Sequence, residues 1–230
     1  MKHLVLLGDR NPDFLTHREL ESTLALLPGD VSVEWVATDS PDAASVNEAD
    51  GLWVIPGSPY RNDEVVYSAI QSARITGQPF LGTCGGFQYA VVEFARNVAK
   101  IVTAQHAETA AGPDDLVVDR LACSLVGEER TICPVPGTQF ASITGPQPFT
   151  GFHWCNYGLS PAWLEALASH GLVVAATAPD AGVEAIELAE HPFFVATLFQ
   201  PQVGCAAAGK LHPLIAAFTD AIRSPINLRA

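Results

Sequence analysis

The chain has 230 residues, of which 48% are apolar and 16% charged, and its formal net charge is −13. This composition predicts one large folded domain with a sizeable core and argues against disorder. A strongly acidic surface repels phosphate backbones and anionic lipids, so we expect neither nucleic acid nor a membrane as a partner.

The first part of the chain alternates short apolar runs with segments of helical spacing. The runs that predict strands are residues 3–7, 31–36, 51–55 and 79–83, and the segments that predict helices are residues 15–27, 64–75 and 87–98. Strands that alternate with helices indicate βαβ units and a mainly parallel sheet.

After residue 100 the pattern changes to short β-like runs with glycine and proline turns between them. We expect strands at residues 116–121, 131–135, 149–157, 172–176, 183–188 and 193–199, and helices at residues 161–168 and 211–222. The early runs of this group predict antiparallel strands beside the main sheet. Since no repeat, low-complexity tract or linker occurs, we expect one domain over residues 1–230. The predicted fold is a flavodoxin-like, doubly wound α/β sheet, mainly parallel, with added antiparallel strands.

The strongest local signal is the stretch of residues 82–86, which reads Gly-Thr-Cys-Gly-Gly between a predicted strand and a predicted helix. It is the thiol version of a nucleophile elbow, in which small residues allow a sharp turn that presents Cys84 at the end of the sheet. The N-terminus of the following helix favours a thiolate, and the N–H of Gly85 can stabilise an oxyanion. The alternative is a buried structural cysteine in a tight turn.

A second loop, residues 56–59 with the sequence Pro-Gly-Ser-Pro, follows another predicted strand. Such a loop can offer a second backbone N–H to an oxyanion, and we expect Gly57 to lie beside the substrate. Turns of this composition are common, so the loop alone is weak evidence.

These motifs resemble the class I glutamine amidotransferases, and among them the glutaminase domain of CTP synthase. Residues 83–88 with 92–98 resemble the cysteine elbow and its helix, and residues 55–58 resemble the oxyanion strand. Residues 183–199 resemble the two strands that lead to the catalytic His-Pro-Glu, and residues 209–214 resemble the start of the last helix. The resemblance covers residues 50–222, and by analogy residues 1–49 supply the first strands of the same sheet.

The resemblance implies site roles residue by residue. Cys84 falls on the nucleophile, and Ser58 and Gly85 fall on the backbone N–H groups that hold the oxyanion. Gln88 matches a glutamine beside the substrate pocket. Glu108 matches the carboxylate that holds the α-ammonium group of the substrate.

The rest of the family's catalytic set departs from the pattern. The family's His-Pro-Glu aligns with Gln200, Pro201 and Gln202, and a glutamine cannot take or deliver a proton near neutral pH. Removal of a triad's base costs about four to six orders of magnitude in rate. The family arginine that binds the substrate carboxylate falls within residues 152–155, where no arginine occurs. Conventional glutaminase activity is therefore in doubt.

His106 and His153 are candidate replacement bases and substrate-binding residues, whereas His191 and His212 stay unassigned. A thiolate at a helix N-terminus needs no histidine to attack a substrate with a good leaving group or easy addition, such as a thioester, activated ester, nitrile, disulfide or peroxide. The leading interpretation is a hydrolase or acyl-transfer enzyme with Cys84 as nucleophile. Its substrate would be small and amide-like or amino-acid-like, such as glutamine.

Two alternatives remain open. The glutamines at positions 200 and 202 favour a catalytically inactive homologue that binds a metabolite or a protein partner. Cys155 and Cys205, either of which could approach Cys84, favour a thiol-redox protein. Nothing in the chain resembles a synthetase domain, so any ammonia formed would pass to a separate acceptor or synthetase subunit.

The cysteine pattern and the chain's start bear on the compartment. The five cysteines are irregularly spaced and contain no CxxC pair, which indicates neither a zinc site nor a disulfide framework. The apolar run at residues 3–7 is too short for a signal peptide. We expect a cytoplasmic protein with reduced thiols, no metal and no cofactor.

Overall fold

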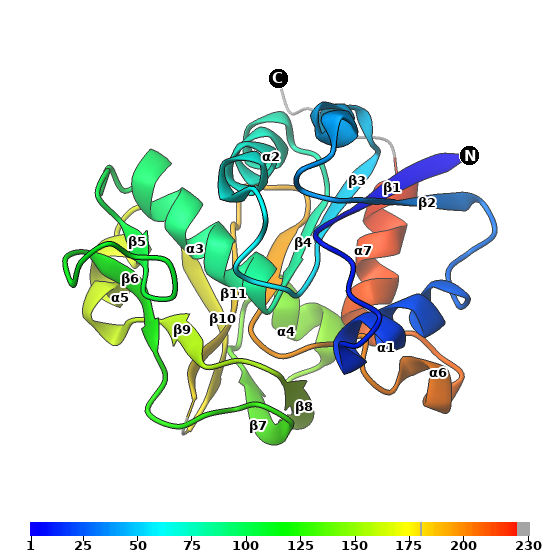
Figure 1. The fold of residues 1–230 in the computed structure, drawn as a ribbon. Helices are drawn as coiled ribbons and strands as arrows, with labels where there is room; N and C mark the ends of the chain where they lie inside the picture. Colours follow the sequence, from blue (N-terminus) through cyan, green and yellow to red (C-terminus); the bar gives the residue numbers. More distant parts are fainter. Residues whose placement is uncertain (180, 225–230) are drawn as a thin grey trace.

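A nine-stranded sheet forms the centre of the computed structural model, which describes residues 1–179 and 181–224 (Figure 1). The strand order is β2-β1-β3-β4-β12-β11-β10-β7-β8. Neighbours from β2 to β12 pair in parallel, and neighbours from β12 to β8 pair antiparallel. The predicted α/β fold, a parallel sheet extended by antiparallel strands, is confirmed.

The parallel half contains the four strands that the early apolar runs predict and the strand expected at residues 193–199. These strands are β1 (Lys2–Leu7), β2 (Val31–Val36), β3 (Gly51–Val54), β4 (Phe80–Thr83) and β12 (Phe194–Thr197). The last three are buried throughout, as expected for strands with a helix layer on each face.

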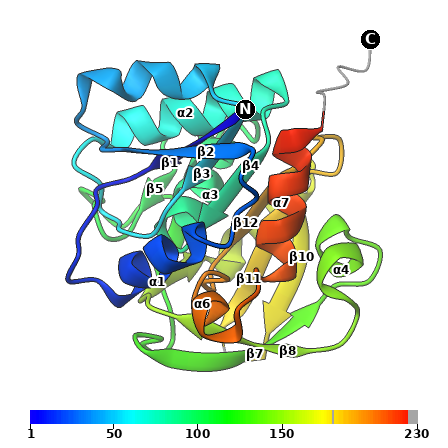
Figure 2. The same cartoon turned by 90° about the vertical axis from the view of Figure 1, so that its right-hand side faces the viewer.

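Helices cover both faces of this half. They are α1 (Leu15–Leu24), the 3-10 helix η1 (Pro41–Glu48), α2 (Asp63–Thr76), α3 (Gly85–Asn97) and α7 (Pro213–Arg223). Apolar residues of α2 and α3 pack in one core cluster, and those of α1 and α7 pack in the cluster on the opposite face (Figure 2). The helix expected at residues 15–27 ends at Leu24, and η1 was not foreseen because its eight residues lack an apolar stripe.

The rest of the chain builds the antiparallel half and a small second sheet. The antiparallel strands are β7 (Glu128–Pro134), β8 (Phe149–His153), β10 (Val173–Ala178) and β11 (Gly182–Glu187). The second sheet contains β5 (Gln105–His106), β6 (Leu116–Arg120) and β9 (Tyr157–Leu159). Short helices lie between them: α4 (Gln139–Thr144), η2 (Pro161–Trp163), α5 (Leu164–Ala168) and α6 (Cys205–Ala208).

The expectation of one strand over residues 149–157 is wrong, because this segment divides between the two sheets. β8 pairs with β7 in the main sheet, whereas β9 pairs with β6 in the second sheet. Residues 154–156 run between the sheets, held by the backbone bonds Leu121 N–H to Asn156 O and Leu125 N–H to Cys155 O. The crossing carries this segment over the carboxyl end of β4.

The helices are short, and α2 has 14 residues. None of the helices in residues 1–179 and 181–224 is both long and apolar enough to cross a bilayer.

Candidate active site

Cys84 stands in a strained turn between β4 and α3. Its φ is 52° and its ψ is −103°, a backbone conformation rare outside glycine, and its N–H donates to Thr197 O at 2.8 Å. A β-carbon on Gly86 would lie only 2.3 Å from the carbonyl oxygen of Val54, so the helix approaches β3 more closely than any side chain allows. The small residues of this motif therefore permit the turn that the sequence predicts.

The loop of residues 56–59 lies directly against the first turn of α3. A β-carbon on Gly85 would lie 3.0 Å from the backbone nitrogen of Ser58 and 2.9 Å from Tyr60 Oη. This close approach places the Ser58 amide and the start of α3 together beside Cys84, at the positions where the sequence predicts an oxyanion site.

His17 of α1 fixes the near end of this loop. Its Nε2 bonds to Pro56 O at 2.7 Å, and its Nδ1 accepts from Asn11 N–H at 2.9 Å. Burial lowers the pKa of His17, so the ring is neutral and Nε2–H is the donor to the loop carbonyl.

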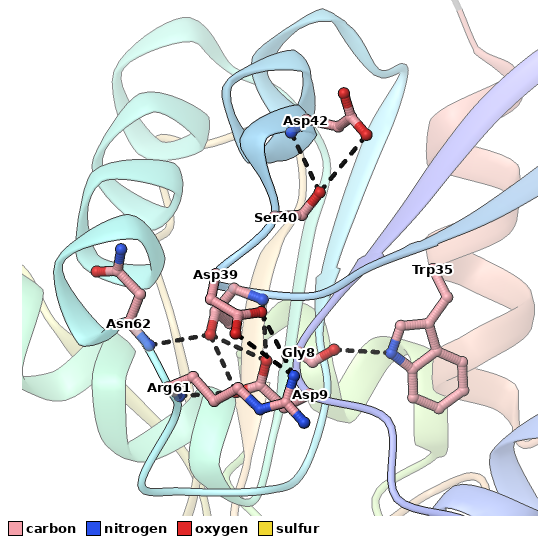
Figure 3. A network of polar contacts seen from close by, with 9 residues as sticks. Gly8, Asp9, Trp35, Asp39, Ser40, Asp42, Arg61 and Asn62 are labelled. Carbon is pink, nitrogen blue, oxygen red and sulfur yellow. Dashed lines mark hydrogen bonds and ion pairs between the residues drawn. The ribbon is translucent and has the colours of Figure 1, made fainter.

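Asp9, two residues after the end of β1, fixes the far end (Figure 3). Its carboxylate accepts from Arg61 N–H at 2.7 Å and from Thr38 N–H at 3.0 Å, and Thr38 Oγ1 accepts from Asn62 N–H at 3.0 Å. Neither Asp9 nor His17 was foreseen as a support of the site. The available signal was the polar break immediately after the first strand.

A cavity of about 190 Å³ opens beside the thiol. Six of the residues that the sequence singled out line it: Gly57, Ser58, Cys84, Gln88, Glu108 and Gln200. The structure thus brings together residues from four separate parts of the chain, at the edge of the sheet where the parallel strands end. Four predicted residues, Gly85, His106, His153 and Gln202, are not in the cavity wall.

Gln88 is the centre of a hydrogen-bond network in this wall. Its Oε1 accepts from Ser58 Oγ at 3.1 Å and lies 3.0 Å from His106 Nε2, while its Nε2 donates to Tyr157 O at 2.8 Å. His106 Nδ1 accepts from Glu108 N–H at 3.1 Å, so both ring nitrogens are occupied. Burial lowers the pKa of His106 to about 4. His106 therefore holds Gln88 and the Glu108 backbone in place and does not reach the thiol.

Glu108 is the only charged side chain among the described residues that line the cavity. Desolvation raises the pKa of its carboxyl, and the neighbouring Ser58 acts in the opposite direction. A carboxylate in this position would attract an ammonium group.

Gln200 and Gln202 bond to each other. Gln202 Nε2 donates to Gln200 Oε1 at 2.9 Å, and both side chains are buried. Gln200 Nε2 and Gln202 Oε1 have no hydrogen-bond partner among the described residues. The pair provides polar atoms near the thiol but no group that exchanges a proton near neutral pH.

His153 on β8 pairs with Glu184 on β11, with 2.9 Å between Nε2 and Oε2, and both side chains are fully buried. His153 Nδ1 and Glu184 Oε1 have no partner among the described residues. Glu184 was not foreseen as a site residue. A glutamate inside the apolar run of residues 183–188 was the one available signal, because unpaired carboxylates are rarely buried.

The structure separates the two cysteines proposed as partners of Cys84. Cys155 lines the same cavity as Cys84, and Cys84 Sγ lies 3.6 Å from the carbonyl oxygen of Trp154, the residue before Cys155. Cys205 belongs to the core on the opposite face of the sheet, where its Sγ bonds to Pro201 O and His212 N–H, each at 3.2 Å. All five thiols are free.

The remaining histidines that the sequence left unassigned have structural partners. His191 Nε2 bonds to Ala73 O at 3.0 Å, and His212 Nδ1 accepts from Leu214 N–H at the start of α7. No group of three or more potential metal ligands occurs in the described part of the chain. The arrangement around Cys84 can thus form and hold a covalent adduct, and among the described residues the one hydrogen-bond partner of its Sγ is the carbonyl oxygen of Trp154.

Comparison with known families and proteins agrees with this geometry. The family model "Glutamine amidotransferase class-I" matches residues 17–212. CTP synthase of Rubrobacter xylanophilus is 35% identical over 205 residues, which are 83% of this chain and 37% of that protein. CTP synthase of Pyrobaculum aerophilum is 36% identical over 173 residues, or 71% of this chain and 33% of that protein. The chain thus spans little more than a third of the length of these curated relatives.

Solved structures show the same fold. The glutaminase domain of Trypanosoma brucei CTPS, solved with bound acivicin, superposes with a TM-score of 0.83 at 22% identity and covers 97% of this chain and 94% of that one. A glutamine amidotransferase from Thermotoga maritima gives a TM-score of 0.57 at 15% identity, and the match covers 96% of this chain and 84% of that one.

Proposed function

This chain belongs to the class I glutamine amidotransferase family, and we propose from that premise that it is a hydrolase or acyl-transfer enzyme with Cys84 as its nucleophile. The observation that carries the proposal is the strained elbow of Cys84, which shares a cavity wall with Ser58 beside the first turn of α3. A backbone held in such a conformation must be stabilised by its surroundings, and such strain clusters at active sites.

The proposed reaction begins when the Cys84 thiolate attacks a substrate carbonyl. The N–H groups of Ser58 and Gly85 then hold the oxyanion of the tetrahedral intermediate. The leaving group departs to give a thioester on Cys84, which water or another acceptor cleaves. Gln88 and Gly57, which line the cavity, orient the substrate.

The cavity favours a small substrate that carries an amine. Glu108 would bind the ammonium group, and the mouth has an apolar rim of Phe14, Val126 and Trp154, which are 40–43% exposed. A cation also stands nearby, since the guanidinium of Arg120 lies 5.4 Å from the ring centre of Tyr157 and its charge acts on Glu108. Glutamine and related amides or amino acids meet these requirements. If glutamine is the substrate, the ammonia passes to a separate acceptor or synthetase subunit.

The leaving group decides the expected rate. Departure of ammonia requires a proton donor, and Gln200 at the cavity wall cannot act as one. We therefore expect slow glutamine hydrolysis and faster turnover of esters or thioesters, whose leaving groups depart without protonation.

The first experiment measures p-nitrophenolate release from p-nitrophenyl acetate and ammonia release from L-glutamine. The proteins are the wild type, Cys84→Ala, and Cys123→Ala as a control for an exposed cysteine outside the cavity. We expect ester turnover in the wild type and Cys123→Ala and its loss in Cys84→Ala. Equal rates in wild type and Cys84→Ala would overturn the proposal.

A gain-of-function variant tests the missing proton donor. The double variant Gln200→His with Gln202→Glu restores the residue types of the family's triad. We expect its rate of glutamine hydrolysis to exceed that of the wild type by several orders of magnitude. The upper limit is the contribution of a triad's base, which is about four to six orders of magnitude in rate. The contrary outcome is a double variant that keeps Cys84-dependent ester turnover and yet shows no increase in glutamine hydrolysis. That result would show that positions 200 and 202 do not correspond to the family's base and its partner.

The second candidate function is a non-catalytic homologue that binds a small molecule or a protein. The observation that favours it is the Gln202 to Gln200 hydrogen bond, which closes the site with two groups that cannot exchange protons. This function predicts no Cys84-dependent turnover together with a rise in melting temperature when glutamine is added.

A further inference from the structure

Two thiols meet at the inner wall of the cavity. Cys84 is at the N-terminus of α3, and Cys155 lies in the segment that crosses from β8 to β9. Each side chain is 5% exposed, both line the cavity, and the neighbouring Cys84 raises the pKa of Cys155. Cys84 Sγ also lies 3.6 Å from the carbonyl oxygen of Trp154, the residue before Cys155. The contact therefore involves the backbone of the crossing segment as well as the two sulfur atoms.

The two thiols differ in their surroundings. Cys84 stands in the strained turn at the start of α3. The neighbouring Cys84, burial and the nearby carboxylate of Glu184 all raise the pKa of Cys155. One thiol is thus placed to attack, while its neighbour keeps its proton until a reaction begins. This asymmetry is typical of an attacking cysteine with a resolving cysteine beside it.

We propose that Cys84 and Cys155 form a dithiol that reduces hydroperoxides and closes to an intramolecular disulfide. The proposal adds a second activity of the same nucleophile to the proposed acyl transfer. A cavity of about 190 Å³ admits a small hydroperoxide, since a water molecule takes about 30 Å³ of liquid volume.

The reaction has two steps. In the first, the sulfur of Cys84 attacks the terminal oxygen of the hydroperoxide; an S–O bond forms, the O–O bond breaks, and the alcohol leaves with the thiol's proton. In the second, the sulfur of Cys155 attacks the sulfenic acid on Cys84; an S–S bond forms, and the hydroxyl leaves as water with the proton of Cys155. Two electrons pass from the two thiols to the peroxide, and a small thiol reductant returns the disulfide to the dithiol.

The disulfide would also close the acyl-transfer site. It removes the nucleophile and ties the crossing segment of residues 154–156 to the elbow. Hydrolase assays under reducing conditions therefore report on the acyl-transfer proposal alone, and thiol counts after oxidation report on the dithiol alone.

The test exposes reduced protein to one equivalent of hydrogen peroxide, alkylates it in denaturant and counts the alkylated thiols by mass spectrometry. The wild type has five thiols, and we expect it to lose two, with a peptide pair joined through Cys84 and Cys155 that dithiothreitol releases. Cys155→Ser should instead accumulate a sulfenic acid on Cys84, which dimedone traps. Cys84→Ser should keep its remaining thiols and lose peroxide turnover with dithiothreitol.

Cys205→Ser is the matched control, because Cys205 is as buried as Cys84 but lies on the other face of the sheet. It should lose two thiols as the wild type does. Retention of all thiols by the oxidised wild type would overturn the proposal, as would a disulfide that omits Cys155 or equal oxidation of Cys84→Ser and wild type. Cys155→Ala repeats the test with a second side chain, so that a folding defect in one variant does not decide the result.

Discussion

At the scale of the single residue, the site depends on how closely the backbone at Cys84 approaches its neighbours. The elbow works only because α3 begins with residues that have no side chain. Gly85 faces the amide of Ser58, and a β-carbon added to Gly85 would lie 3.0 Å from the Ser58 nitrogen. The two N–H groups proposed to hold an oxyanion are therefore positioned by the absence of one methyl group.

We predict that Gly85→Ala removes catalysis with a smaller effect on folding. The methyl group must displace the Ser58 loop, which separates the oxyanion donors, and the loss of one such donor costs about 10²–10³ in rate. Ester turnover should fall by that factor, whereas alkylation of Cys84 by iodoacetamide, which forms no oxyanion, should change little. Overpacking should cost about 1–3 kcal/mol in free energy of unfolding.

The control for this prediction is Gly29→Ala, at a position where an added β-carbon meets no atom within 4 Å. It should leave ester turnover and stability near the wild-type values. Full ester turnover in Gly85→Ala would contradict the assignment of the oxyanion site.

At the scale of the elements, the position of α3 depends on its contact with α2. Glu93 on α3 is fully buried, and Arg74 on α2 donates to both of its carboxylate oxygens, at 2.9 Å from Nε and 2.6 Å from Nη2. Asn97 donates to the same carboxylate at 3.1 Å. Because the elbow is the first turn of α3, this ion pair helps to hold the nucleophile in place.

We predict that Arg74→Ala destabilises the protein by about 3–5 kcal/mol, because it leaves the Glu93 carboxylate buried without its main partner. The matched control is Arg61→Ala, which breaks the exposed pair with Asp39, 3.4 Å apart, and should cost about 0–1 kcal/mol. Urea unfolding of the three proteins gives both values. Similar costs for the two variants would contradict the structural role of the buried pair.

At the scale of the whole molecule, several buried imidazoles link stability to pH. Burial lowers the pKa of His106 and of His212 to about 4, and it also lowers the pKa of His17 and His191. The unfolded chain binds protons at these rings from about pH 6.5 downward, whereas the folded protein does not. The contribution of these neutral rings to the free energy of unfolding is therefore complete above about pH 6.5 and is lost as the pH falls toward 4.

We predict that the free energy of unfolding decreases between pH 6.5 and pH 4, by about 1.4 kcal/mol per pH unit for each ring that stays neutral in the folded state. His106→Gln should be less stable than the wild type at pH 7, because the Gln88 network loses a bond. The free energy of unfolding of His106→Gln should nevertheless fall less steeply than that of the wild type as the pH decreases from 6.5 to 4. Parallel pH profiles for the two proteins would show that His106 does not titrate in this way.

The sequence by itself determined the α/β fold and placed the nucleophile and the Ser58 loop in the cavity wall. Strands and helices that alternate imply a parallel sheet, and in such a sheet the loops after neighbouring strands meet at one edge. For that reason the local motifs around Ser58 and Cys84 were enough to place them together. The resemblance to glutamine amidotransferases added Gln88 and Glu108, and both line the cavity.

Only the tertiary structure decided which distant side chains pair. The sequence left Cys155 and Cys205 as equal candidates beside Cys84, and the break between β8 and β9 brings Cys155 to the thiol while α6 carries Cys205 to the opposite face. The same holds for His153, whose partner Glu184 lies 31 residues further along the chain. A motif fixes a local turn because it acts through neighbouring residues. A contact between distant residues depends instead on strand register and chain path, which the packing of the whole molecule sets.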